Sequence, residues 1–280
     1  MNYQWYPGHM TKAMRQMQED IKLIDLIIEI VDARIPLSSR NPDIDKLAGG
    51  KSRIVILNKA DLADERVNKK WLEYFEDKGI YTLLLNSRQT GEYKAVRSKV
   101  DEACLEKRKR DEKRGIKNRP VRAMVVGIPN VGKSTFINGL SGKAAAKTGN
   151  RPGVTKGKQW IKVDRSFELL DTPGILWPKF EDQATGMRLA FIGSMNDSIL
   201  IGEELATDFI DYLKDMYPDS IRKYYDLQDD VSEAYHILCE IGKKRGCLRS
   251  GGEIDVDKAA ALLLDDFRAG KIGRITLEQP

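Results

Sequence analysis

The chain has 280 residues, enough for one large domain or for a domain with a smaller partner, and its 41% hydrophobic and 32% charged residues are ordinary for a globular protein. No apolar run approaches the roughly 18–20 residues of a membrane span, the N-terminus lacks a signal or transit peptide pattern, and the three cysteines lack zinc-site spacing, so we expect a reduced, cytoplasmic setting without a membrane partner. The net charge is +5, but residues 181–280 carry 20 acidic and 12 basic side chains, which leaves a surplus of +13 on residues 1–180 and favours a polyanionic partner.

Strands and helices alternate through the first part of the chain. Apolar runs predict buried strands at residues 26–31, 54–57, 80–85 and 123–126, and a pair of strands at 160–163 and 167–170. Helical spacing predicts helices at residues 11–24, 62–78, 91–113 and 133–140. Such alternation predicts an α/β fold with a mainly parallel sheet covered on both faces.

The pattern changes near residue 180. Helices are predicted at residues 203–216, 230–243 and 256–269, with only a hint of a strand at 274–277. We therefore expect an α/β domain over residues 1–178 and a small, mainly helical domain over residues 179–280.

Residues 127–134 (GIPNVGKS) fit the phosphate-loop pattern GxxxxGK[ST] between a predicted strand and a predicted helix. In such a loop the backbone N–H groups and the helix N-terminus face the phosphates, the lysine contacts the β and γ phosphates, and the serine hydroxyl ligates Mg²⁺. The residues expected to hold the nucleotide here are Asn130, Val131, Gly132, Lys133, Ser134 and Thr135.

A guanine-recognition motif precedes the phosphate loop. Residues 58–61 (NKAD) fit NKxD at the end of a predicted strand. The Asp61 carboxylate can accept from N1 and N2 of guanine, whereas adenine would present a lone pair to it. We expect Asn58 to hold the loop and Lys59 to pack on the base. Asn86, Ser87 and Arg88 follow the next strand, where a backbone N–H usually contacts guanine O6.

A second phosphate-contacting loop follows. Residues 171–174 (DTPG) fit DxxG, in which Asp171 holds a Mg²⁺-bound water and the Gly174 N–H contacts the γ-phosphate. Between the two loops, Thr155 is the candidate for a second Mg²⁺ ligand, with Thr148 as its neighbouring rival. The cofactors expected are therefore GTP and Mg²⁺.

The order of these motifs is rotated relative to small GTPases, in which the phosphate loop comes first. Because every motif follows the carboxyl end of a strand, such a circular permutation leaves the site geometry intact. The DxxG loop then leads directly into the helical domain, which predicts that the γ-phosphate state controls how that domain is held.

The permuted order, together with residues 5–10 (WYPGHM) and Lys12, resembles the ribosome-biogenesis GTPase A family over essentially the whole chain. The resemblance implies a circularly permuted Ras-like GTPase domain and a C-terminal helical domain that binds RNA. It also implies action on the maturing large (50S) ribosomal subunit and its rRNA, not on DNA. Slow GTP hydrolysis stimulated by ribosomal particles, and release on hydrolysis at a late assembly step, are further expectations.

The catalytic residue is not the usual one. Ras-like enzymes place a glutamine after DxxG to orient the attacking water, but Ile175 stands here. His9 is the leading substitute because imidazole can orient or deprotonate water near neutral pH, although a turn histidine would show the same sequence. Asn130 is also a candidate K⁺ ligand, as this residue is in related potassium-dependent GTPases.

Two basic segments are candidate RNA contacts. Residues 105–122 carry nine basic and three acidic side chains, and the acidic C-terminal part contains an isolated basic cluster. The candidate residues are Lys107, Arg108, Lys109 and Arg110 in the first segment, and Lys243, Lys244, Arg245 and Arg249 in the second. A solvated helix face paired at i,i+4, or cations at a helix C-terminus, would explain them without RNA.

Three other functions fit parts of the sequence. A GTPase of another substrate class, such as tRNA modification or other ribonucleoprotein assembly, shares the nucleotide motifs. A small-molecule P-loop kinase is disfavoured because it has no need of NKxD or DxxG. A nucleotide-gated RNA-binding protein with little turnover would be excluded by measurable GTP hydrolysis.

Overall fold

The computed structural model describes residues 8–116, 119–142, 144–146, 159–177, 180, 182–195, 201–228 and 232–280, with the side chain of His9 outside that description. Its central element is a six-stranded sheet in the order β3-β2-β1-β4-β6-β5. Every neighbouring pair is parallel except the antiparallel pair of β5 and β6. The strands are β1 (Leu26–Asp32), β2 (Ser52–Asn58), β3 (Tyr81–Leu85), β4 (Val121–Val126), β5 (Gln159–Lys162) and β6 (Phe167–Asp171). The predicted α/β fold with a mainly parallel sheet is confirmed.

Alternate residues of the strands face the two sides of the sheet, and helices cover both. Val55 and Leu57 of β2 pack with Trp71 and Phe75 of α3 (Glu65–Asp77). Ile54 and Ile56, which alternate with them along β2, belong to the larger core. This core also contains the apolar faces of α4 (Tyr93–Ala103) and α6 (Lys133–Ser141). The remaining helices of this part are α1 (Gly8–Asp20), α2 (Pro42–Ala48) and α5 (Leu105–Lys113).

The single helix expected over residues 91–113 is wrong, because the chain forms two consecutive helices separated at Cys104. Val96 and Val100 of α4 are buried, whereas no residue of α5 is. The apolar spacing therefore ends at the break. The charged segment beyond the break has no apolar face that could pack against the sheet. Nothing therefore holds this segment in line with α4 as one continuous helix.

β1 is fully buried but is not wholly apolar. Glu29 lies in its middle with no exposed surface, and its carboxylate accepts hydrogen bonds from Arg40 (3.2 Å) and from Arg53. Arg53 and Arg40 also bond Asp45 at the start of α2. A charge buried in a strand requires such partners, so this cluster ties α2 to the sheet.

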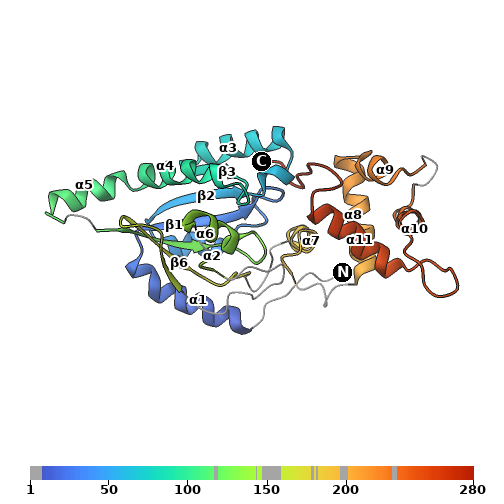
Figure 1. Ribbon diagram of the computed structural model, residues 1–280, viewed down its shortest axis with the longest axis horizontal. Helices are drawn as coiled ribbons and strands as arrows, with labels where there is room; N and C mark the ends of the chain where they lie inside the picture. Colours follow the sequence, from blue (N-terminus) through green and yellow to red (C-terminus); the bar gives the residue numbers. More distant parts are fainter. Residues whose placement is uncertain are drawn as a thin grey trace.

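The helical part forms one end of an elongated molecule (Figure 1). It consists of α7 (Gln183–Phe191), α8 (Gly202–Met216), α9 (Ser220–Tyr225), α10 (Ala234–Lys244) and α11 (Val256–Arg268). The ring centroids of Phe209 and Phe267 lie 4.6 Å apart, and Phe191 stacks edge-on against Phe209 at 5.1 Å. These rings join α7, α8 and α11 into one core. None of the described helices is long and apolar enough to cross a lipid bilayer.

The strand hinted at residues 274–277 is wrong, because this segment forms no ladder with the sheet. It returns in an irregular extended path to the sheet domain, and Figure 1 shows the C-terminus beside α3. The backbone N–H of Ile275 donates to the carbonyl of Leu62 (3.1 Å), and that of Leu277 donates to the carbonyl of Arg34 (2.7 Å). The chain therefore crosses from the sheet domain to the helices and back again.

Candidate nucleotide-binding site

The phosphate loop lies between β4 and α6, at the carboxyl edge of the sheet. Gly132 adopts φ 97°, and a Cβ at this position would lie 2.4 Å from the Nδ2 atom of Asn58. Only glycine avoids both the strained backbone and the clash. The guanine-recognition loop is thus in direct contact with the phosphate loop.

Asn58, the last residue of β2, joins three segments by hydrogen bonds. Its Nδ2 donates to the carbonyl of Val131 in the phosphate loop (2.7 Å). Its Oδ1 accepts from the N–H (3.1 Å) and the hydroxyl (2.6 Å) of Ser87 after β3. The side chain is buried, so these bonds fix the relative positions of the loops that contact base and phosphates.

Lys59 adopts φ 58°, and its ammonium group bridges two loops. It donates to the carbonyl of Asn130 (2.8 Å) and to the carboxylate of Asp32 at the end of β1 (2.9 Å). The other predicted guanine contacts surround this loop. Asp61 is half-buried in the turn after Lys59, and Asn86 accepts from the N–H of the exposed Arg88 (3.0 Å).

Lys133 and Asp171 form the charged centre of the phosphate site. Lys133 is 7% exposed and donates to the carbonyl of Ile128 (2.8 Å). Burial lowers the pKa of Lys133 to about 8, an effect that the charge of Asp171 opposes. Burial likewise raises the pKa of Asp171 to about 6, against the opposing effect of Lys133. Burial removes water from both charged groups, and a bound charged ligand would supply the interactions that this water made.

Asp171 fits the predicted contact with hydrated Mg²⁺. Its Oδ1 atom is buried and has no hydrogen-bond partner among the described residues. A metal-bound water would satisfy that oxygen. Ser134, the candidate direct ligand, is the second residue of α6, directly after Lys133. Thr155 and its rival Thr148 lie outside the described residues.

Gly174 brings the DxxG loop against the phosphate loop. A Cβ at Gly174 would lie 2.8 Å from the Nζ atom of Lys133 and 2.9 Å from the backbone of Pro129. The next N–H, that of Ile175, donates to the carbonyl of Gly127 (3.3 Å). The two phosphate-contacting loops are therefore adjacent, although 40 residues separate Ser134 from Gly174 in the chain.

Asn130 carries the unusual backbone angle φ 62°, and its side chain reaches the helical part. Its Nδ2 donates to the carbonyl of Gly193 (2.6 Å) in the turn after α7. In the same turn, the hydroxyl of Ser194 donates to the carbonyl of Pro129 (2.8 Å). The phosphate loop is thus bonded directly to the segment that leads into the helices, a contact that no motif in the sequence indicates.

Sequence reasoning also missed Asp32 and Arg34. Arg34 is 1% exposed and pairs with Asp32 through both nitrogens of its fork (Nε and Nη2, each 2.8 Å). Burial would raise the pKa of Asp32, but Arg34 and Lys59 more than offset it and hold that pKa well below its ordinary value. The Nη1 atom of Arg34 faces the carbonyls of Phe267 (3.5 Å) and Arg268 (3.4 Å) at the end of α11. The signal that could have found Asp32 in the sequence is the position of an acidic residue at the end of a predicted buried strand.

The predicted RNA-contacting residues lie away from this site, on α5 and around the end of α10. The Nζ atom of Lys107 is 2.6 Å from Asp111 and 3.6 Å from Asp25, and its side chain is only 13% exposed. Arg245 stacks on the rings of Tyr224 and Tyr225 at 5.1 and 5.0 Å. The others make exposed contacts: Arg108 with Asp101, Lys109 and Arg110 with Glu106, Lys243 with Glu240, Lys244 with Asp226, and Arg249 with Asp257.

A phosphate loop, a guanine-recognition loop and a DxxG loop at one edge of a parallel sheet define a P-loop GTPase, here with its loops in circularly permuted order. A family model described as "50S ribosome-binding GTPase" matches residues 122–234. The whole chain is 49% identical to the Ribosome biogenesis GTPase A of Bacillus cereus, of which it covers 95%. It is 33% identical to that of Thermotoga maritima, over 99% of this chain and 94% of that protein.

The solved structures agree with the sequence relatives. GNP-bound YlqF from T. maritima matches with a TM-score of 0.68 and 27% identity, over 96% of this chain and 98% of that one. The GDP-bound YlqF matches with a TM-score of 0.69. The chain therefore belongs to the ribosome biogenesis GTPase A family, and it is a GTP hydrolase. The resemblance seen in the sequence is confirmed, and with it the P-loop kinase is excluded.

Proposed function

We propose that this GTPase binds the maturing large ribosomal subunit in its GTP form and is released by hydrolysis, which times a late assembly step in the cytoplasm. The names of its relatives supply the ribosomal partner. The observation that carries the nucleotide control is the bonding of Asn130 and Pro129 in the phosphate loop to Gly193 and Ser194. A change at the γ-phosphate would act through these bonds on the entry to the helices.

Sedimentation with purified ribosomal subunits tests this function. We expect the protein to pellet with the large subunit in the presence of a non-hydrolysable GTP analogue and to remain in the supernatant with GDP. GTP turnover should rise with large subunits and not with small ones. Equal pelleting in the two nucleotides, or equal stimulation by the two subunits, would contradict the proposal.

We propose His9 as the residue that positions the attacking water. The structure supports the need for a substitute, because Ile175 is 2% exposed and Leu176 is fully buried, so neither side chain can hold water. His9→Ala should sharply lower turnover stimulated by the large subunit while leaving GTP affinity nearly unchanged. Gln18→Ala, an exposed change on the same helix, is the matched control. Lost affinity with normal turnover would refute the role.

We propose Ser134 and Thr155 as direct Mg²⁺ ligands and Asp171 as a ligand through water. The buried, unpartnered oxygen of Asp171 supports this assignment. For Asn130, a K⁺ contact at the phosphates remains a proposal. Higher turnover in KCl than in NaCl would support the cation, and identical rates would remove it.

We propose that the helical domain, from about residue 179 onward, contributes to rRNA binding with the basic residues of α5 and α10. Arg108, Lys109, Lys243, Lys244 and Arg249 pair with acids at exposed positions, and such pairs are worth about 0–1 kcal/mol each. Exchange of these acids for phosphates therefore costs little. RNA affinity that falls steeply with salt would support contacts of this type.

A further inference from the structure

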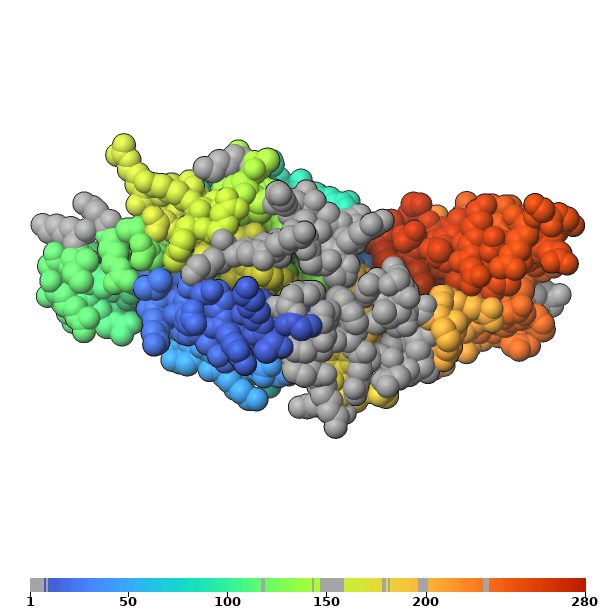
Figure 2. Space-filling model, turned by 90° about the horizontal axis from the view of Figure 1, so that it is seen from below, coloured from blue at the N-terminus to red at the C-terminus, as the bar shows by residue number. Residues whose placement is uncertain are grey.

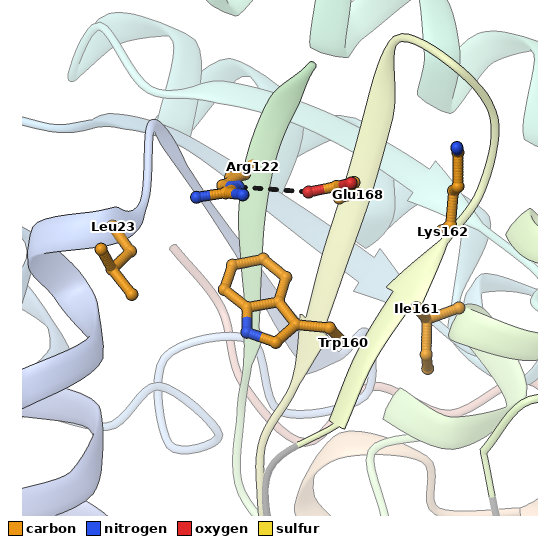
Figure 3. Close-up of a pocket in the computed structure, with 6 residues that line it drawn as sticks. All are labelled: Leu23, Arg122, Trp160, Ile161, Lys162 and Glu168. Carbon is orange, nitrogen blue, oxygen red and sulfur yellow. Dashed lines mark hydrogen bonds and ion pairs between the residues drawn. The ribbon is translucent and has the colours of Figure 1, made fainter. Parts of the chain in front are cut away.

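A hollow of about 320 Å³ lies at the end of β5 that points away from the nucleotide site. It is lined by Leu23, Arg122, Trp160, Ile161, Lys162 and Glu168 (Figure 3). Arg122 and Glu168 stand near the amino ends of β4 and β6, whereas the nucleotide loops follow the carboxyl ends of these strands. The hollow is therefore separate from the GTP site. Figure 2 shows the α1 region beside the segment around residues 159–170, with the helical part at the opposite end of the molecule.

The register of three strands gathers four of the lining residues, Arg122, Trp160, Lys162 and Glu168, on one face of the sheet. Lys162 on β5 pairs with Glu168 on β6, which in turn pairs with Arg122 on β4. Trp160 is two residues from Lys162 and shares its face, while Ile161 between them is buried on the other. In Figure 3 the indole of Trp160 reaches from β5 across the neighbouring strands toward Leu23.

The floor of the hollow exposes apolar surface to water. Trp160 is 40% exposed on the edge strand of the sheet, and Leu23, the last residue of the short 3₁₀ helix Ile21–Leu23 that follows α1, is 49% exposed. Burying an aromatic ring is one of the larger gains available to a folding chain, so a tryptophan left at a sheet edge favours a partner. Because the guanidinium of Arg122 lies over this ring, such a partner would cover the part of the indole that remains exposed.

The charge around this floor is positive. Arg122 lies 5.2 Å from the centre of the Trp160 ring and pairs with Glu168 (3.1 Å), which neutralises the one acid that lines the hollow. Lys162 lines the hollow, and Lys22 directly precedes the lining residue Leu23; both lysines are exposed, and neither makes an ion pair with any residue that the structure describes. An anionic ligand with a planar group fits this combination.

We propose that this hollow binds one unpaired RNA nucleotide, with its base stacked on Trp160 beside Leu23 and its phosphates contacted by Lys162 and Lys22. This inference rests on the proposed function, because it requires an RNA partner. An aromatic platform among cations is how proteins hold single strands, since every base has a π-face. A base inside a duplex cannot reach the ring, so the site selects a looped-out or single-stranded position. A protein in place of RNA would need acidic side chains positioned to pair with Lys162 and Lys22.

Binding of short RNA tests the proposal. Fluorescence anisotropy of a labelled oligouridylate should report binding about tenfold weaker for Trp160→Ala than for the unchanged protein, since base stacking on an aromatic ring is worth about 1–3 kcal/mol. Trp160→Phe should retain most of the affinity because the ring remains. Lys162→Gln should reduce the salt dependence by about one phosphate contact. The affinity for a blunt RNA duplex should be the same for Trp160→Ala and for the unchanged protein.

Tyr81→Ala is the matched control, because Tyr81 is 36% exposed on β3, the opposite edge of the same sheet. Basal GTP hydrolysis without RNA should be unchanged in Trp160→Ala, which shows that the fold is intact. If Trp160→Ala binds oligouridylate as tightly as the unchanged protein does, the proposal is overturned. Weaker sedimentation with the large subunit but normal oligouridylate binding would also overturn it, in favour of a protein occupant.

The two proposals fail in different ways. If the unchanged protein does not sediment with large subunits in either nucleotide, the ribosomal function fails whatever Trp160 does. If it sediments normally and Trp160→Ala changes neither sedimentation nor oligouridylate binding, only the base-stacking site fails.

Discussion

Gly174 is the point at which the DxxG loop comes closest to the phosphate loop. The methyl group of an alanine there would approach the ammonium group of Lys133 and the backbone of Pro129 to within 3.0 Å. A lysine side chain can move, but the backbone of the phosphate loop cannot move without losing its shape. The smallest substitution at this position therefore displaces the group that contacts the phosphates.

We predict that Gly174→Ala weakens binding of a GTP analogue by about tenfold or more, because a hydrogen bond to a charged group is worth about 1.5–3 kcal/mol. Calorimetric titration of the purified variant measures the effect. Gly91→Ala is the control, since a Cβ there meets no atom within 4 Å. Affinity equal in the two variants would show that the loops separate when the nucleotide binds.

At the scale of elements, β1 connects the guanine-recognition loop to the helical part. Asp32 at the end of β1 bonds Lys59 of the guanine loop on one side and Arg34 on the other. Arg34 lies against the carbonyls that end α11, where the helix dipole favours a cation, and its guanidinium is 5.0 Å from the ring of Phe267. One carboxylate therefore holds the half-buried Lys59 of the guanine loop and the buried Arg34, which contacts the helical part.

We predict that Asp32→Asn lowers the free energy of unfolding by about 3–5 kcal/mol, because it leaves the buried guanidinium of Arg34 without its counter-charge. Urea denaturation followed by circular dichroism measures this change. Lys69→Gln is the control, because it breaks an exposed ion pair on α3, with side chains 69% and 65% exposed, and should cost at most about 1 kcal/mol. Equal losses in the two variants would mean that Asp32 carries no more than a surface pair does.

The sequence predicts elements well where a single local signal decides them. All six strands were located from their apolar runs, and the runs of β2 and β6 end at the motif residues Asn58 and Asp171. The short helices α2, α7 and α9 were not predicted, since segments of six to nine residues show too little periodicity and depend on tertiary packing. The break at Cys104 and the irregular tail likewise follow from what the chain packs against.

The candidate site divides in the same way. Asn58, Lys133 and Gly174 belong to contiguous motifs whose spacing carries the chemistry. Gly193 and Arg34 belong to no such motif. Their contacts with the phosphate loop and with α11 arise only when distant segments meet, so the sequence alone does not reveal them.

At the scale of the whole molecule, three of the contacts between the helical part and the sheet domain bear on the nucleotide site or on the chain end. The first is the pair of bonds between the phosphate loop and the turn at Gly193, and the second is Arg34 against α11. The third is the C-terminal segment, where Glu278 accepts from the backbone N–H groups of Leu37 (2.8 Å) and Ser38 (3.0 Å). Arg188 of α7 reaches the same carboxylate (3.3 Å). Only the first of these attachments contacts the phosphate loop directly.

Glu278 is buried, and that burial raises its pKa although Ser38 and Arg188 oppose the shift. A carboxyl group whose folded-state pKa lies above its unfolded value favours folding most strongly when protonated. Its contribution to stability is therefore present below the unfolded pKa and is lost as the pH rises through the folded value. Near neutral pH the contact depends on the donors that surround the carboxylate.

We predict that Glu278→Ala lowers the free energy of unfolding by about 1–3 kcal/mol, because it leaves two backbone donors without their acceptor. Hydrogen exchange should also become faster at residues 37–38 and in α7, since the tail bonds the first and reaches the second through Arg188. Glu253→Ala, at an exposed position in the helical part, is the control. Faster exchange confined to the last residues of the chain would mean that the tail covers the sheet domain without holding the helices, and that other contacts, such as those of the phosphate loop and Arg34, connect the two parts.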